Sequence, residues 1–130
     1  MIVDASAVLA MLLKEPEEYA FADFIGECAD EVSISPVNYL EIALRIDRGP
    51  TPALSEALDP LLHRLGVRIA SVGPDQARLA REAYQRYGKG KHEARLNLGD
   101  CFAYALAKAR GEPLLFKGDD FRLTDVEAAV

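Results

Sequence analysis

The chain has 130 residues, half of them hydrophobic, and a formal net charge of −6. This length suits one core, so we expect residues 1–130 to form a single domain, and the hydrophobic content excludes a disordered chain. The negative charge excludes a protein that coats nucleic acid through a basic face. It does not exclude chemistry on nucleic acid, because clustered carboxylates can bind divalent cations that invert the local field.

Short apolar runs alternate with helical patterns along the chain. Four runs are predicted strands, at residues 1–3, 31–35, 67–72 and 113–118. Six stretches are predicted helices, at residues 5–14, 16–29, 35–48, 53–66, 73–88 and about 99–110. Ser35 is the expected N-cap of the third helix, with Pro36 at its first position. The alternation predicts an α/β domain with a mainly parallel sheet, in which sites lie beyond the carboxyl ends of the strands.

The sequence shows no sign of a membrane span, an export signal or a disulfide framework. The longest apolar run near the start, ASAVLAMLL, ends at Lys14 and is far shorter than the about 20 residues that a bilayer requires. The opening MIVD lacks the basic region and cleavage site of a signal peptide, so we expect a cytoplasmic protein. Cys28 and Cys101 form no C-x-x-C pair, and we interpret both as structural.

Acidic residues occupy positions that a parallel sheet can bring to one edge. Asp4 ends the first predicted strand, and Asp119 and Asp120 follow the fourth. Glu41 lies on the helix after the second strand, and Asp100 stands at the head of the very apolar last helix. A carboxylate in such surroundings is costly unless it is paired, hydrogen-bonded or bound to metal.

Each acid also has a purely structural interpretation. Asp4 and Asp100 would each cap a helix. Glu41 would lie on an exposed helix face and pair with Arg45, four residues later. The Gly-Asp-Asp after the fourth strand would be an ordinary solvated turn.

Taken together, the carboxylates predict metal chemistry. Mg²⁺ and Mn²⁺ prefer oxygen ligands, and bound metal can activate a water and stabilise a leaving oxygen at phosphorus. The residues therefore predict a metal-dependent phosphodiesterase or phosphatase. No Ser-His-Asp set competes, because His63 and His92 lie in unremarkable polar settings, and no glycine-rich phosphate loop is present.

Four segments resemble the PIN-domain ribonucleases, and specifically the VapC-type toxins of bacterial toxin–antitoxin pairs. They are MIVDASAVLAML, SPVNYLEIALR, LNLGDCFAYALAK and PLLFKGDDFRLTDV, and the likeness runs from Met1 to about Val126. The resemblance implies a three-layer α/β/α fold around a mainly parallel sheet. It implies Mg²⁺- or Mn²⁺-dependent endonucleolytic cleavage of RNA such as tRNA or rRNA, a VapB-type antitoxin that blocks the site, and a homodimer.

The resemblance also assigns roles to residues. Asp4, Glu41 and Asp100 match the first, second and third acids of the family, and Asp4 and Asp100 would bind the metal. Ser6 matches the small polar position after the first acid, where it would orient Asp4 or a metal-bound water, although a serine in a helix's first turn is equally ordinary. Asn38 lies one helical turn before Glu41 and is expected to face the same cleft.

The fourth acid stays open between Asp119 and Asp120. Many family members carry an acid three residues before the Phe of this motif, and here that position is Gly118. One of the two following acids must substitute for it.

A basic loop, YGKGKHEARLN, precedes Asp100. It offers Lys89, Lys91, His92 and Arg95 for contact with the phosphates of RNA, although a solvated loop explains the same composition. The sequence shows no aromatic platform on which single-stranded bases would stack.

Three other protein classes share parts of this pattern. A receiver domain needs an acidic pair near Asp4 and an acceptor Asp after the third strand, where Gly73 and Pro74 stand. A haloacid-dehalogenase-type phosphatase needs Asp where Ser6 stands. A protein-binding module could use the same acids to bind a partner's arginines, and divalent-metal binding would separate it from a nuclease.

Overall fold

The computed structural model describes residues 1–130, and its centre is one sheet in which every strand pair is parallel. The strands are β1 (Ile2–Val3), β2 (Val32–Ile34), β3 (Val67–Ile69) and β4 (Leu114–Leu115). Their order is β3-β2-β1-β4, with Ile2 paired to Ser33 on one side and to Leu114 on the other. The first strand of the chain therefore lies inside the sheet.

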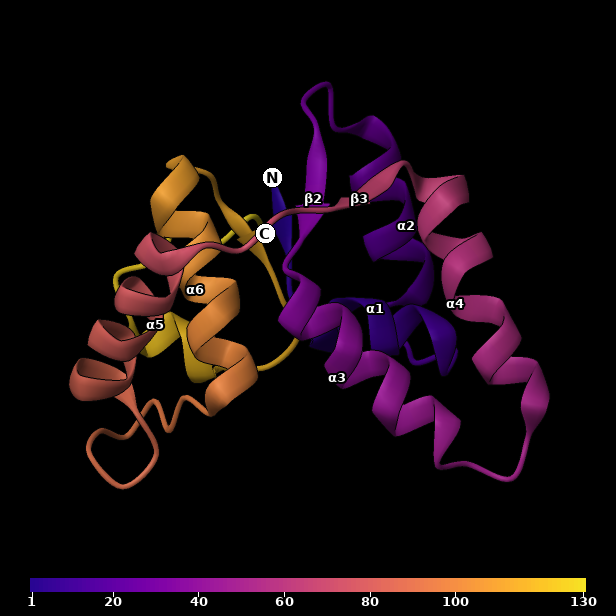
Figure 1. Cartoon of the computed structure of the whole chain (residues 1–130). Coiled ribbons are helices and arrows are strands. Elements are labelled where there is room, and N and C mark those ends of the chain that lie inside the picture. Colours follow the sequence, from indigo (N-terminus) through magenta and orange to yellow (C-terminus); the bar gives the residue numbers. More distant parts are fainter.

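Helices cover both faces of this sheet (Figure 1). They are α1 (Ala5–Leu12), α2 (Glu18–Glu27), α3 (Pro36–Asp47), α4 (Pro52–Leu65), α5 (Pro74–Tyr87) and α6 (Leu98–Arg110), followed by a short 3₁₀ helix, η1 (Asp120–Leu123). The first four helices pack on one face, and α5 and α6 pack on the other. This arrangement confirms the predicted three-layer α/β/α fold. None of the helices has the length and apolar character that a membrane span requires.

Successive side chains along a strand point to opposite faces of the sheet, and this divides the core into two clusters. Val3 and Leu115 point into the cluster under α1 to α4, and Ile2 and Leu114 point into the cluster under α5 and α6. All four side chains are fully buried. Strands buried on both faces read as continuous apolar runs, which is why the sequence pattern located them.

The predicted strands at 31–35 and 67–72 are longer than the observed ones. Ser35 leaves β2 because its side chain accepts a hydrogen bond from the Val37 amide and caps α3, as expected. β3 pairs only with β2, so it loses its partner where β2 ends, and Ala70 donates the last bond to Ile34. The carboxyl end of the sheet is thus set by a helix cap.

Candidate active site

Asp4 follows β1 directly and is buried at the carboxyl edge of the sheet, with 3% of its surface exposed. Its Oδ2 accepts hydrogen bonds from the Ser6 amide at 3.0 Å and the Ser6 hydroxyl at 2.6 Å. Asp4 is therefore the N-cap of α1, as its structural interpretation held. Its other oxygen, Oδ1, faces the side chain of Asn38. Burial raises the pKa of Asp4 above its usual value, and the hydrogen bonds from Ser6 oppose that rise.

Ser6 links the carboxyl ends of β1 and β4. Its hydroxyl donates to Asp4 and accepts a hydrogen bond of 3.0 Å from the Lys117 amide, which follows β4. The expectation that Ser6 orients Asp4 agrees with these contacts. The same bonds also hold the segment after β4 against the first acid.

Asn38 joins three elements through one side chain. It is fully buried on α3, and its Nδ2 donates to the carbonyl of Gly99 at 2.9 Å. The same nitrogen lies 3.4 Å from Glu41 Oε2 and 3.5 Å from Asp4 Oδ1. Its Oδ1 is buried and has no hydrogen-bond partner within the protein. Asn38 therefore lies beside both Asp4 and Glu41, and its side-chain oxygen is buried without a partner.

Glu41 is half-buried where α3 meets α6. It forms no ion pair with Arg45, so the interpretation as an exposed helix pair is wrong. A Cβ built on Gly99 would lie 2.0 Å from Glu41 Oε2, so the glycine is what admits this carboxylate. Burial, and then the negative charge of Asp4, raise the pKa of Glu41, against the hydrogen bond from Asn38.

Asp100 lies in the first turn of α6, where Asn97, rather than Asp100, is the N-cap. The two residues form a capping box: Asn97 Oδ1 accepts from the Asp100 amide at 2.9 Å, and Asp100 Oδ2 accepts from the Asn97 amide at 3.0 Å. Burial raises the pKa of Asp100 to about 7, with added repulsion from the charges of Asp4, Glu41 and Asp120. The capping bond opposes this rise.

The two candidates for the fourth acid differ in position. Asp119 and Asp120 are both exposed, and Gly118 before them has a φ of +100° that suits glycine. The charge of Asp120 is among those that raise the pKa of Asp100, whereas that of Asp119 is not. The charge of Asp120 therefore acts on the cluster, which favours Asp120 over Asp119 as the fourth acid.

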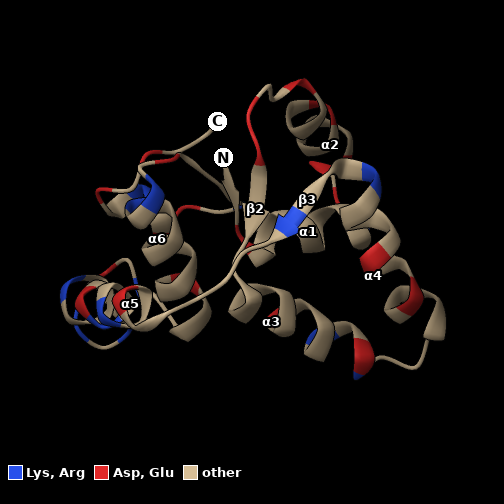
Figure 2. Ribbon diagram, turned by 45° about the horizontal axis from the view of Figure 1, so that its top comes forward, with Lys and Arg blue, Asp and Glu red and all other residues tan.

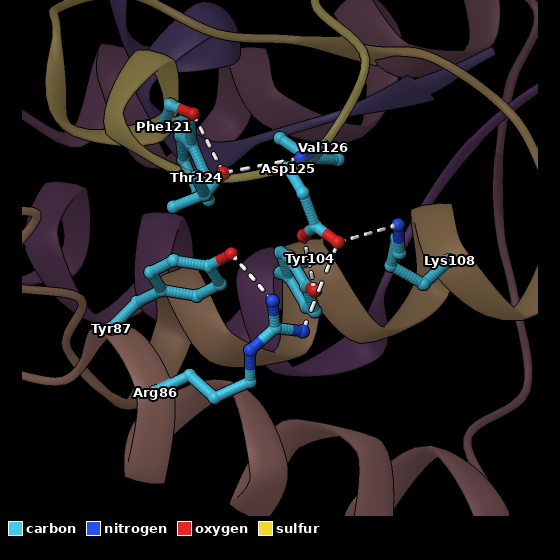
Figure 3. Close-up of polar contacts among 8 residues, drawn as sticks. All are labelled: Arg86, Tyr87, Tyr104, Lys108, Phe121, Thr124, Asp125 and Val126. Carbon is cyan, nitrogen blue, oxygen red and sulfur yellow. Dashed lines mark hydrogen bonds and ion pairs between the residues drawn. The ribbon is translucent and has the colours of Figure 1, made fainter.

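The segment that carries Asp120 is tied to α6 further along (Figure 3). Tyr104 on α6 donates a hydrogen bond of 2.6 Å to Asp125 Oδ1, and Lys108 donates one of 3.2 Å to Oδ2. Thr124 donates to the carbonyl of Phe121 at 2.6 Å and closes η1. Because α6 also carries Asp100, these bonds fix the two acid-bearing segments relative to each other.

No cation of the protein neutralises the central acids. Asp4, Glu41 and Asp100 form no salt bridge, and the ammonium of Lys117 is engaged by Glu15 and Glu17. No three acidic, histidine or cysteine side chains lie together as a ready metal cage. Mg²⁺ does not need one, because it is usually held by one or two carboxylates together with waters and substrate phosphates. The uncompensated carboxylates and the unsatisfied Asn38 oxygen fit such an ion.

The basic loop after α5 is only partly free for a ligand. Lys89, Lys91 and Arg95 are exposed, as their predicted role requires. His92 is half-buried: its ring packs edge-on against Tyr87, and its Nδ1 accepts a hydrogen bond from the Ala94 amide. His92 therefore serves the structure of the loop. Figure 2 shows further Lys and Arg residues gathered along α5.

Comparison with known proteins places this chain in one family. The family model of the PIN domain matches residues 1–127. The chain is 48% identical to Ribonuclease VapC of Mycolicibacterium smegmatis, over 98% of each chain. It is 47% identical to Ribonuclease VapC30 of Mycobacterium tuberculosis, over 97% of this chain and 95% of that one, and 43% identical to VapC42 of the same species, over 99% and 98%. The chain belongs to the PIN-domain family and, within it, to the VapC ribonucleases.

Proposed function

We propose that residues 1–130 form a single nuclease domain, a metal-dependent endoribonuclease that acts in the cytoplasm as the toxin of a VapBC-type pair. The observation that carries this proposal is the group of carboxylates at the carboxyl edge of the sheet, of which Asp4 is buried and Glu41 and Asp100 are half-buried, with no cation of the protein to compensate them. The names of the similar proteins, which are ribonucleases, support the assignment of ribonuclease activity in this proposal. In a purely structural role, Asp4, Glu41 and Asp100 would repel one another, and the capping bonds of Asp4 and Asp100 oppose but do not cancel the resulting rise in pKa.

In this proposal Asp4 and Asp100 hold Mg²⁺ or Mn²⁺. When bound, the ion acidifies a water and stabilises negative charge on the leaving oxygen of the phosphodiester. Ser6 and Asn38 orient Asp4 through the hydrogen bonds described above. Glu41, with its raised pKa, is placed to accept a proton from the attacking water.

Asp120, rather than Asp119, supplies the fourth carboxylate. Its charge reaches Asp100, and it is carried on a segment anchored to α6 through Asp125. Because Asp120 is exposed, it acts at the rim of the site, on solvent-side ligands, and does not line the buried floor.

The proposed substrate is a structured RNA such as tRNA or rRNA, which the family resemblance suggests. Lys89, Lys91 and Arg95 are exposed on the loop that leads into α6, where they can contact phosphates next to the acids. Such contacts position an RNA but do not select a base.

Two protein partners complete the proposal. A VapB-type antitoxin would block the site, and an arginine offered to the free carboxylate oxygens would satisfy the charge that the protein leaves unpaired. A second copy of the chain would cover an apolar patch beside the site. Leu40, Leu44 and Leu98 are 55%, 52% and 73% exposed there and line one hollow of about 310 Å³. Exposed apolar patches of this kind mark interaction surfaces.

Cleavage of total cellular RNA by the purified, antitoxin-free protein tests the nuclease. We expect fragments with Mg²⁺ or Mn²⁺, none with EDTA, and none from Asp100→Asn, because the charge is lost while the shape stays. Asp23→Asn is the matched control, since Asp23 is exposed on α2 and forms no hydrogen bond or ion pair. Cleavage by Asp100→Asn at the wild-type rate would refute the site. Failure to cleave or to bind divalent metal would instead indicate a protein-binding module.

A further inference from the structure

A groove runs between α5 and α6, beside the acidic site. Its volume is about 330 Å³, near the lower end of the usual range of ligand pockets, about 300–1,000 Å³. Seven residues line it: Ala77, Ala80, Arg81, Tyr84, Leu98, Cys101 and Phe102. The two alanines leave the space, and the walls are almost wholly apolar with Arg81 as the one charged side chain. The groove therefore suits one small, flat, apolar-faced group beside an anion.

The aromatic wall of this groove is held in place. Tyr84 is 42% exposed, and its hydroxyl donates a hydrogen bond of 3.3 Å to the carbonyl of Lys89. The ammonium of Lys91 lies 5.8 Å from the centre of the ring. A Cβ on Gly88 would lie 2.4 Å from the ring, so the glycine is needed for the ring to occupy this position. A ring fixed before binding costs little further ordering when a ligand stacks on it.

The groove adjoins the acidic site. Leu98 lines both this groove and the neighbouring hollow, which Glu41 and Gly99 also line. Cys101, on the groove's wall, is next to Asp100 in the chain. One exposed leucine thus stands between the acids and the groove.

Cations surround the groove although the whole chain is acidic. Arg81 lies on its wall, and Lys89 and Lys91 follow Tyr84 on the basic loop. Figure 2 shows several Lys and Arg residues along α5 and its following loop, among some acidic ones. Alternating cations and an aromatic face are the combination that binds single-stranded nucleic acid.

We propose that this groove is a subsite for one unpaired base of the RNA, which stacks on Tyr84 while Arg81 and Lys91 contact the adjoining phosphates. The inference rests on the proposed ribonuclease function and deepens it, because it defines the substrate class. Bases in a duplex are stacked on each other and unavailable to the groove. The enzyme therefore requires a single-stranded nucleotide next to the bond that it cleaves.

Binding to Asp100→Asn protein in Mg²⁺ tests the subsite without cleavage. The probe is a fluorescent single-stranded RNA of about eight nucleotides, within the usual site size, with a duplex and an abasic version of the same length. In this background Tyr84→Leu and the groove-filling Ala77→Leu should each weaken single-strand binding by about fivefold to 100-fold, the range for loss of one stacked base. Tyr84→Phe should keep most of the affinity, since the ring remains.

Two controls make the result specific. Tyr19→Leu removes another tyrosine, 75% exposed on α2, and should leave RNA affinity unchanged. The effect of Tyr84→Leu should vanish on the abasic RNA. Circular dichroism establishes whether each variant is folded. If Tyr84→Leu does not fold, Ala77→Leu still tests the groove, because Ala77 is exposed and its replacement should leave the fold intact.

The other outcomes overturn the proposal in distinguishable ways. If wild-type protein cleaves RNA but Tyr84→Leu and Ala77→Leu bind and cleave as it does, the subsite is wrong and the nuclease stands. If either variant changes the sedimentation of the protein and not its RNA affinity, the groove is an interface between two copies. If the wild type neither binds nor cleaves RNA, the proposed function fails and the subsite fails with it.

Discussion

Replacing Asp100 with Asn should make the metal-free protein more stable while abolishing its proposed activity. The folded state holds this carboxyl near the charges of Asp4 and Glu41, whereas the unfolded chain does not. Asn removes the charge, and its oxygen can still accept the capping bond from the Asn97 amide. Stability and activity are therefore opposed at this position, as they often are at functional sites.

The size and the pH range of the effect follow from the pKa of Asp100. It is 3.8 in the unfolded reference and about 7 in the folded protein. Between these values the folded state binds more protons, so wild-type stability falls as the pH rises from about 4 to about 7. At about 1.4 kcal/mol per pH unit the upper bound is about 4 kcal/mol. Because Asp100 is partly exposed, we expect a gain of about 1–3 kcal/mol in the variant.

Urea unfolding in EDTA measures this gain at two pH values. Asp100→Asn should exceed the wild type in free energy of unfolding at about pH 8, and the difference should be several times smaller at about pH 4.5, because it vanishes only below the unfolded pKa of 3.8. Added Mg²⁺ should stabilise the wild type more than the variant, since binding to the native state raises stability. A variant that is no more stable than the wild type at about pH 8, or equally more stable at both pH values, would refute the repulsion argument.

Three further changes test separate contacts. Gly99→Ala should fold, but because its methyl group displaces the Glu41 carboxylate, RNA cleavage should fall by about 100-fold, as for a misplacement of about 1 Å. Asp120→Asn should reduce cleavage in Mg²⁺ more than Asp119→Asn, since only Asp120 acts on Asp100; equal losses would contradict that assignment. Ser35→Ala should lower the free energy of unfolding by about 1 kcal/mol in urea melts, through loss of the α3 cap.

The fold was predictable because its signals are local. Continuous apolar runs marked β1 and β4, an alternating β-branched run marked β2, and Ser35 and Pro36 marked the start of α3. Strand ends were predicted less well, because the end of β3 depends on where its neighbour stops pairing and not on its own residues. A residue such as Val72 has strand propensity but no partner.

The site was predictable as a set of acids but not as an arrangement. Motif likeness picked out Asp4, Glu41 and Asp100, and the structure brings their elements together at Asn38. The need for glycine at position 99 depends on the approach of α3 to α6, which no local pattern encodes. The capping box is different: Asn97 three residues before Asp100 is a recognisable spacing that the sequence interpretation missed. Tyr84 and Phe102 lie on different helices, so their shared groove was invisible in the sequence.

The position of β1 inside the sheet has a consequence for folding during synthesis. Asp4 and Ser6 are synthesised long before β4 and Lys117, yet β1 pairs with β4, and Ser6 accepts a hydrogen bond from the Lys117 amide, 111 residues later in the chain. Contacts between such distant residues form late and slowly, after the loops between them have closed. A nascent chain therefore carries its first acid without the scaffold that completes the site. The candidate site is completed only after β4 has been made and has paired with β1.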